Sequence, residues 1–109
     1  MKVCLNVIPI AQATVQPDDG KVVELEYFVR CITGPEGEAL YGLRVDKRQP
    51  GGDLIEREET EALTGSIDEA TVLAEAFAEG TVMPCVLLEM VEEWFCHDTK
   101  QVLLGKEFA

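Results

Sequence analysis

The feature that most constrains the fold is a run from Val22 to Ile32 in which apolar and polar side chains largely alternate. Alternate residues of a strand point to opposite faces of a sheet, so the run predicts a strand with one apolar and one polar face. The apolar face holds Val23, Leu25, Tyr27, Val29 and Cys31, and the polar face holds Glu24, Glu26 and Arg30. A single polar face is typical of an antiparallel sheet that is covered on one side.

Three turn signals, each combining Pro with Gly or Asp, divide the first half of the chain. They lie at residues 16–21, 34–37 and 49–52. Pro presets φ and Gly permits unusual values, so both residues favour turns between strands. The expected strands lie at about residues 2–10, 22–33, 38–47 and 53–61. The last of them has few apolar residues, and we expect it at an exposed edge of the sheet.

The pattern becomes helical after Gly65. Ser66 followed by Glu69 is a capping box, which predicts a helix at about 67–79 that ends at Gly80. Its expected apolar face is Ile67, Ala70, Leu73, Ala74 and Phe77. A second helix is expected at about 83–96, with Pro84 in its first turn. Its apolar arc covers about 200°, twice the ~100° stripe that a helix on a sheet needs.

These elements predict an α+β fold. We expect an antiparallel β-meander of three to four strands, followed by two α-helices packed on one face of the sheet. Residues 1–109 are expected to form a single domain, because a chain of this size can bury a core without metal or disulfide. The tail from His97 to Ala109 contains Val102-Leu103-Leu104, which is compatible either with a last strand or with a cover over the second helix.

The negative charge is concentrated in one stretch. The net charge is −12, and residues 53–93 hold twelve acids against the single base Arg57. This charge repels phosphate backbones and anionic lipid heads, so we expect no nucleic acid and no membrane as partner. Helix solvation and capping explain seven of the twelve acids. Asp53 and the acids of residues 56–61 have no such explanation.

No catalytic, cofactor-binding or metal site is expected. The only histidine, His97, follows Cys96 directly, and neighbouring residues on a helix do not face each other. Cys85 and Cys96 are about 16 Å apart on the expected helix, too far to share one ion. No nucleotide-binding or nucleophile motif is present.

A cytoplasmic location is expected. The apolar run that follows Lys2 resembles a short signal peptide, but Asn6 and Pro9 interrupt it. The cysteines are Cys4, Cys31, Cys85 and Cys96. Their even number permits a disulfide framework, but a core of this size needs no disulfides, which favours buried thiols in a reducing compartment.

The wide apolar arc of the second helix has two alternative covers, which are the domain's own sheet and tail, or a partner. If a partner covers it, the function that remains is a non-enzymatic protein-interaction or regulatory module. One candidate interface is the centre line of the second helix, which a second copy of the chain would cover in a homodimer: Met83, Leu87, Met90 and Trp94. The alternative is an acidic inhibitor or decoy that binds a basic protein through Glu56, Glu58, Glu59 and Glu61. A small-ligand binder or enzyme would need a deep pocket, for which Tyr27, Tyr41 and Arg44 are the candidates.

The order of four segments resembles an uncharacterised family of similarly sized proteins from Gram-positive anaerobic bacteria, which is described only as a domain of unknown function. The segments are Glu26-Tyr27-Phe28-Val29, Tyr41-Gly42-Leu43-Arg44-Val45, the helix from Ser66 to Ala78, and Pro84 to Phe95. The resemblance covers about residues 22–95 and implies strands followed by helices. It implies no activity, cofactor or site residue.

Overall fold

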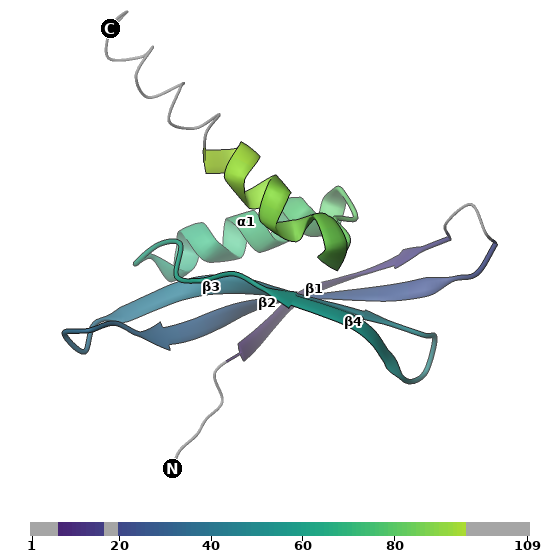
Figure 1. The fold of residues 1–109 in the computed structure, drawn as a ribbon, viewed down its shortest axis with the longest axis horizontal. Coiled ribbons are helices and arrows are strands. Elements are labelled where there is room, and N and C mark those ends of the chain that lie inside the picture. The colour runs from purple at the N-terminus through teal and green to yellow at the C-terminus, as the bar shows by residue number, and fades with distance from the viewer. Residues whose placement is uncertain (1–6, 17–19, 96–109) are drawn as a thin grey trace, which may run out of the picture.

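The computed structural model describes residues 7–16 and 20–95. Four strands form one antiparallel sheet in the order β1-β2-β3-β4, and two helices follow on one face of it (Figure 1). The strands are β1 (Val7–Val15), β2 (Val23–Thr33), β3 (Ala39–Arg48) and β4 (Leu54–Glu59). This arrangement confirms the expected α+β fold, with a four-stranded meander and both helices on the same side.

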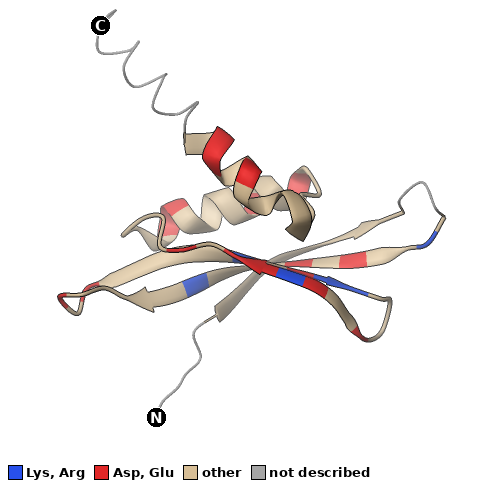
Figure 2. Ribbon diagram, viewed as in Figure 1, with Lys and Arg blue, Asp and Glu red and all other residues tan. Residues whose placement is uncertain are grey.

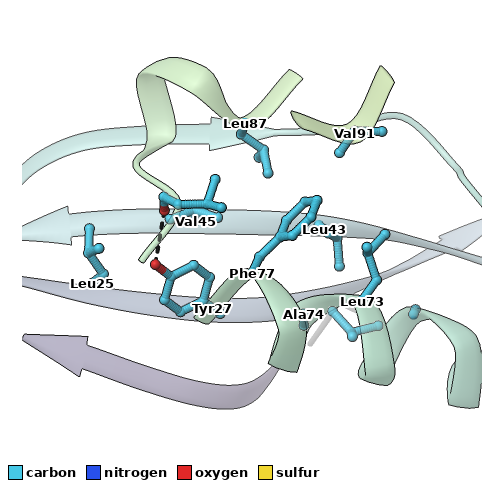
Figure 3. Close-up of a cluster of buried hydrophobic side chains, with 12 residues drawn as sticks. Leu25, Tyr27, Leu43, Val45, Leu73, Ala74, Phe77, Leu87 and Val91 are labelled. Carbon is cyan, nitrogen blue, oxygen red and sulfur yellow. Dashed lines mark hydrogen bonds between the residues drawn. The ribbon is translucent and has the colours of Figure 1, made fainter. Parts of the chain in front are cut away.

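The core lies between the sheet and the two helices. The alternation in β2 buries Val23, Leu25, Tyr27 and Val29 on the helix side. Figure 3 shows side chains of both helices packed against those of the central strands. The core side chains are Leu25, Tyr27, Val29, Leu43, Val45, Ala70, Leu73, Ala74, Phe77, Val82, Leu87 and Val91. At about 1.5–3 kcal/mol per fully buried large apolar side chain, this layer is the main favourable term in folding.

The first strand lies further along the chain than the expected range of about 2–10. It spans Val7–Val15, and residues 2–6 of the expected range lie outside the described residues. Its second half pairs in regular register with β2, from Ala11 opposite Tyr27 to Val15 opposite Val23. A bulge between Pro9 and Ala11 shifts the register. The small apolar residues after the bulge fit under α1, whereas sequence patterning favoured only the bulkier residues before it.

The helix α1 (Ile67–Glu79) has the expected range and N-cap. The Ser66 side chain accepts a hydrogen bond from the Glu69 backbone N–H at 3.2 Å, as in a capping box. The Glu69 carboxylate departs from that motif, because it accepts from the hydroxyl of Thr64 instead of from the Ser66 backbone. Thr64 in turn accepts from the Ser66 N–H at 3.0 Å and thereby completes the cap.

The connection after α1 is a Schellman motif with an unusual residue at its left-handed position. Gly80 is the C-cap with φ −86°, while Thr81 has φ +49°. The Val82 N–H donates to the Phe77 carbonyl at 3.0 Å, which is the long-range bond of that motif. The buried Tyr27 hydroxyl then donates to the Val82 carbonyl at 2.9 Å, so strand β2 holds this connection in place (Figure 3).

The second helix begins with a 3-10 turn, η1 (Pro84–Val86), and continues as an α-helix through residues 87–95. Position 96 of the expected range and the tail 97–109 lie outside the described residues. Leu87 and Val91 are buried against the sheet. Within the described ranges, neither helix alone is long and apolar enough to cross a membrane; the two reach that length only as a pair bent by 119°.

Candidate functional site

A cleft opens between the first half of α1 and the end of the second helix. Its volume is about 350 Å³, and its apolar lining consists of Val72, Leu73, Trp94 and Phe95. Val72 is 58% exposed although it lies in the middle of α1, and Trp94 is 41% exposed. Exposed large apolar side chains that gather around a hollow are typical of a binding surface. We call this feature the interhelical cleft.

The Trp94 ring packs against Phe77, and Trp94 remains 41% exposed. Its ring meets Phe77 edge-to-face, with the ring centroids 6.1 Å apart and the planes at 86°. This geometry is favourable for aromatic pairs and fixes the orientation of the indole ring. Because Phe77 is buried in the core, the cleft wall is anchored to the core.

The rim of the cleft is acidic. Asp68 and Glu69 line it, and the helices around it carry further acids. From Ser66 to Phe95 there are seven acidic residues and no Lys or Arg: Asp68, Glu69, Glu75, Glu79, Glu89, Glu92 and Glu93. Figure 2 shows the same contrast, with red bands and no blue ones on the two helices. The helical layer therefore carries no basic residue that compensates these acids, and two of them, Asp68 and Glu69, line the apolar hollow.

The expected interface on the second helix is only partly available at the surface. Leu87 is fully buried under the helix, and Met83 and Met90 are half-buried against the core. Only Trp94 of the four is exposed. The wide apolar arc is thus divided between the sheet, the side of α1 and the interhelical cleft.

The expected acidic segment lies on the edge strand β4 and just beyond it, and its acids point to two faces. Glu56 and Glu58 are opposite Lys47 and Val45, on the helix side of the sheet. Glu59 is opposite Arg44, on the uncovered side. Glu61 follows the strand and is exposed. These four carboxylates therefore do not form one continuous surface.

A network of ion pairs covers the sheet face that the helices leave open. At its centre is Asp46, whose side chain is 0% exposed even though no described element packs over it. The Arg57 side chain donates to both carboxylate oxygens at 2.8 and 3.1 Å, and Arg44 does the same at 3.1 Å. Arg48 lies 3.5 Å away. The guanidinium groups themselves exclude water from this carboxylate.

The network extends to both sides of Asp46. Arg48 pairs with Glu26 at 2.9 Å, and Arg30 lies 3.7 Å from Glu59 and donates to the Thr60 carbonyl. Arg44 also stacks on Phe28, with its guanidinium carbon 4.7 Å from the ring centroid. All four arginines of the chain belong to this face. We call the group the open-face network.

The charges of the arginines decide the ionisation of Asp46. Burial alone would raise the pKa of this carboxyl, but hydrogen bonds and charge from Arg57 and Arg44 outweigh burial and lower the pKa below its usual value. The pKa of Arg57 is raised in turn by its hydrogen bond to Asp46. The pair is therefore charged at neutral pH.

The third candidate pocket is not formed, because its residues do not lie on one face of the sheet: Tyr27, Tyr41 and Arg44. Tyr27 is buried on the helix side, and Tyr41 packs against the same core. Arg44 points to the opposite face of the sheet. Among the described residues no three His, Cys, Asp or Glu gather as metal ligands would.

The amino-acid sequence alone did not identify Val72 and Phe95 as cleft residues. It also did not identify Asp46 as the centre of an ion-pair network. Val72 had a detectable signal, because it is an apolar residue on the otherwise polar side of α1. Asp46 also had one, since the arginines at 44 and 48 share its face of the strand by alternation.

Comparison with protein families gave one finding. The profile of a family described as "Family of unknown function (DUF6514)" matches residues 6–97, which is most of the chain. Comparisons with curated proteins and with solved structures gave no significant match.

Proposed function

Because the chain belongs to the DUF6514 family, whose function is unknown, we propose from its own surface that it is a non-enzymatic protein-interaction module. The interhelical cleft is its binding site, and its partner is a basic segment that carries apolar anchor side chains. The observation that carries this proposal is the exposure of Val72 and Trp94 around a hollow of about 350 Å³ with an acidic rim.

The size of the cleft suits side chains of a protein partner. A hollow of this volume is at the lower end of the range for small-molecule sites and accommodates one or two large apolar side chains. Each anchor that it buries contributes about 1.5–3 kcal/mol. Two anchors contribute about 3–6 kcal/mol together, and after the cost of association the ion pairs at the rim still leave a weak complex, with a dissociation constant in the high-micromolar to millimolar range.

The charge around the cleft favours a basic partner over a second copy of the chain. A copy that docked through this cleft would bring its own uncompensated helix acids against those of the first. Like charges that face each other across an interface cost several kcal/mol. A partner rich in Lys or Arg would be attracted by the negative charge of the same helix acids. The homodimer through Met83, Leu87, Met90 and Trp94 is therefore not the form we propose.

The single tryptophan of the chain makes the proposal directly testable. Trp94 lies in the cleft wall, so its fluorescence reports on this site alone. The probe is a synthetic helical peptide with Leu on one face and Lys elsewhere, and the control peptide carries Glu in place of Lys. We expect the Lys peptide to shift the emission to shorter wavelength, with a dissociation constant in the high-micromolar to millimolar range. The Glu peptide should leave the emission unchanged.

Two matched variants separate cleft binding from general attraction to an acidic protein. Val72→Gln removes an exposed apolar side chain from the cleft. Val22→Gln removes an apolar side chain that is 40% exposed but lies outside the cleft lining. The first should weaken binding of the Lys peptide about tenfold or more, and the second should not. Equal affinity of both variants and the wild type, or no response to the peptide at all, would reject the cleft as the site.

We also propose a cytoplasmic location. Cys31 and Cys85 are free thiols within the described part of the chain, as expected in a reducing compartment. A thiol titration of freshly isolated protein should find all cysteines reduced. The resemblance further predicts relatives in Gram-positive anaerobic bacteria, which a survey of family members would check.

A further inference from the structure

The sheet face opposite the helices is a second candidate surface, independent of the interhelical cleft. Both helices lie on one side of the sheet, and no described element covers the other side (Figure 1). Strand register places both charged and apolar side chains on this open face. Its charged residues are Glu24, Glu26, Arg30, Arg44, Asp46, Arg48, Arg57 and Glu59.

The open face is electrically balanced in an otherwise acidic protein. Its four arginines equal its four acids, whereas the chain as a whole carries −12. Two copies of such a chain repel each other wherever acidic surfaces meet. They can approach most closely through a face on which the charges already compensate. Among the surfaces formed by the described residues, the open face is therefore the one best suited to contact with a second copy.

We propose that the open faces of two copies pack against each other about a two-fold axis. A two-fold axis brings the same surface of both copies together. Because the open face carries both arginines and carboxylates, arginines of one copy can lie against carboxylates of the other. Arg57 and Arg48 are suited to this role, because their side chains are partly exposed, at 38% and 32%. The buried Asp46 holds both guanidinium groups in position before contact is made.

The face also offers apolar side chains beside polar ones, and an area at the lower end of the range for specific interfaces. A hollow of about 250 Å³ beside Phe28 is lined by Pro9 and Gln12 among other residues of β1 and β2. At about 3.3 Å per residue and about 4.8 Å between strands, the four strands present roughly 600 Å² before side-chain relief is counted. A standard stable interface needs about 800 Å² per partner, so this dimer is of small to standard size.

Sedimentation equilibrium of the full chain, from micromolar to millimolar concentration, tests the proposal. A dimer is expected at about 0.15 M salt, where the long-range repulsion between the two acidic bodies is screened. No basic peptide is present in this experiment, so the dimer and the binding of a basic segment in the cleft can each fail alone.

A pair of double variants localises the interface. Gln12→Glu with Thr14→Glu adds acids to exposed positions of the open face, while Leu88→Glu with Val72→Glu adds the same charge to the helical layer. We expect the first to raise the dimer dissociation constant at least about tenfold and the second to leave it within about threefold. Circular dichroism checks that both remain folded. A monomer at all concentrations, or a dimer weakened by the helical variant or by neither, would overturn the proposal.

Discussion

Replacing Asp46 with Asn is the most informative test of the open-face network. The change conserves the shape of the side chain and removes its charge. The carboxylate accepts four hydrogen bonds, two from Arg57 and two from Arg44. An Asn side chain has one oxygen, and its NH₂ group would face guanidinium donors, which cannot accept from it.

The expected loss follows from burial and partner exposure. Removing one partner of a buried ion pair typically costs about 3–5 kcal/mol. Here Asp46 is 0% exposed, but the side chains of Arg44 and Arg57 are 16% and 38% exposed, so water replaces part of the lost interaction. We therefore expect Asp46→Asn to lower the free energy of unfolding by about 2–4 kcal/mol. The matched control is Glu26→Gln, whose single partner Arg48 is also partly exposed; it should cost less than about 1 kcal/mol.

Urea unfolding followed by circular dichroism measures both variants, and its pH dependence gives a second criterion. The pKa of Asp46 is lower in the folded chain than its usual value. Its contribution is therefore fully present above the unfolded pKa of about 3.9 and is lost as pH falls through the folded pKa. The difference between wild type and Asp46→Asn should be constant near neutral pH and should narrow in acid. If Asp46→Asn destabilises no more than Glu26→Gln, the carboxylate does not organise this face.

Three further changes test other parts of the fold, each by urea unfolding. Thr81→Gly should stabilise the chain by about 1 kcal/mol, because Thr81 has φ +49° and glycine adopts that region without strain; a loss of stability would contradict the assigned conformation. Gly42→Ala should cost about 1–3 kcal/mol, because its Cβ would lie 2.6 Å from the Glu61 carbonyl oxygen; a neutral effect would mean that this close approach is absent. Tyr27→Phe should cost about 1–3 kcal/mol, because it leaves the Val82 carbonyl without its donor, and no change would show that the carbonyl reaches water.

Local sequence patterns predicted the elements that depend on periodicity. The alternation in β2 and the capping signal of α1 follow from neighbours a few residues apart, and both agree with the structure. The end of β1 was predicted wrongly: the strand ends at Val15, whereas the expected range ended at about residue 10. Its second half is built from Ala11 and Ala13, small residues that become good strand positions only under the packed helix α1.

The two surfaces could not be predicted in full, because they depend on contacts between distant residues. Asp46 is buried by Arg57, eleven residues away, through the register of the β3–β4 hairpin. The breadth of the apolar arc on the second helix was visible in the sequence. How this arc is divided among neighbouring elements was not visible in the sequence, because Leu87 contacts the sheet while Trp94 meets Phe77 of α1. Periodicity identifies an apolar face but not which neighbour covers each part of it.

The interhelical cleft, as we propose, binds a basic segment with apolar anchors. The most direct test is the change in backbone and indole NMR chemical shifts when the isotope-labelled full chain is titrated with the Leu–Lys peptide. We predict that the largest changes cluster at the cleft, at Asp68, Val72, Leu73 and the indole N–H of Trp94. Changes spread evenly over distant acids such as Glu56 and Glu79, or centred on the open-face network, would contradict the account.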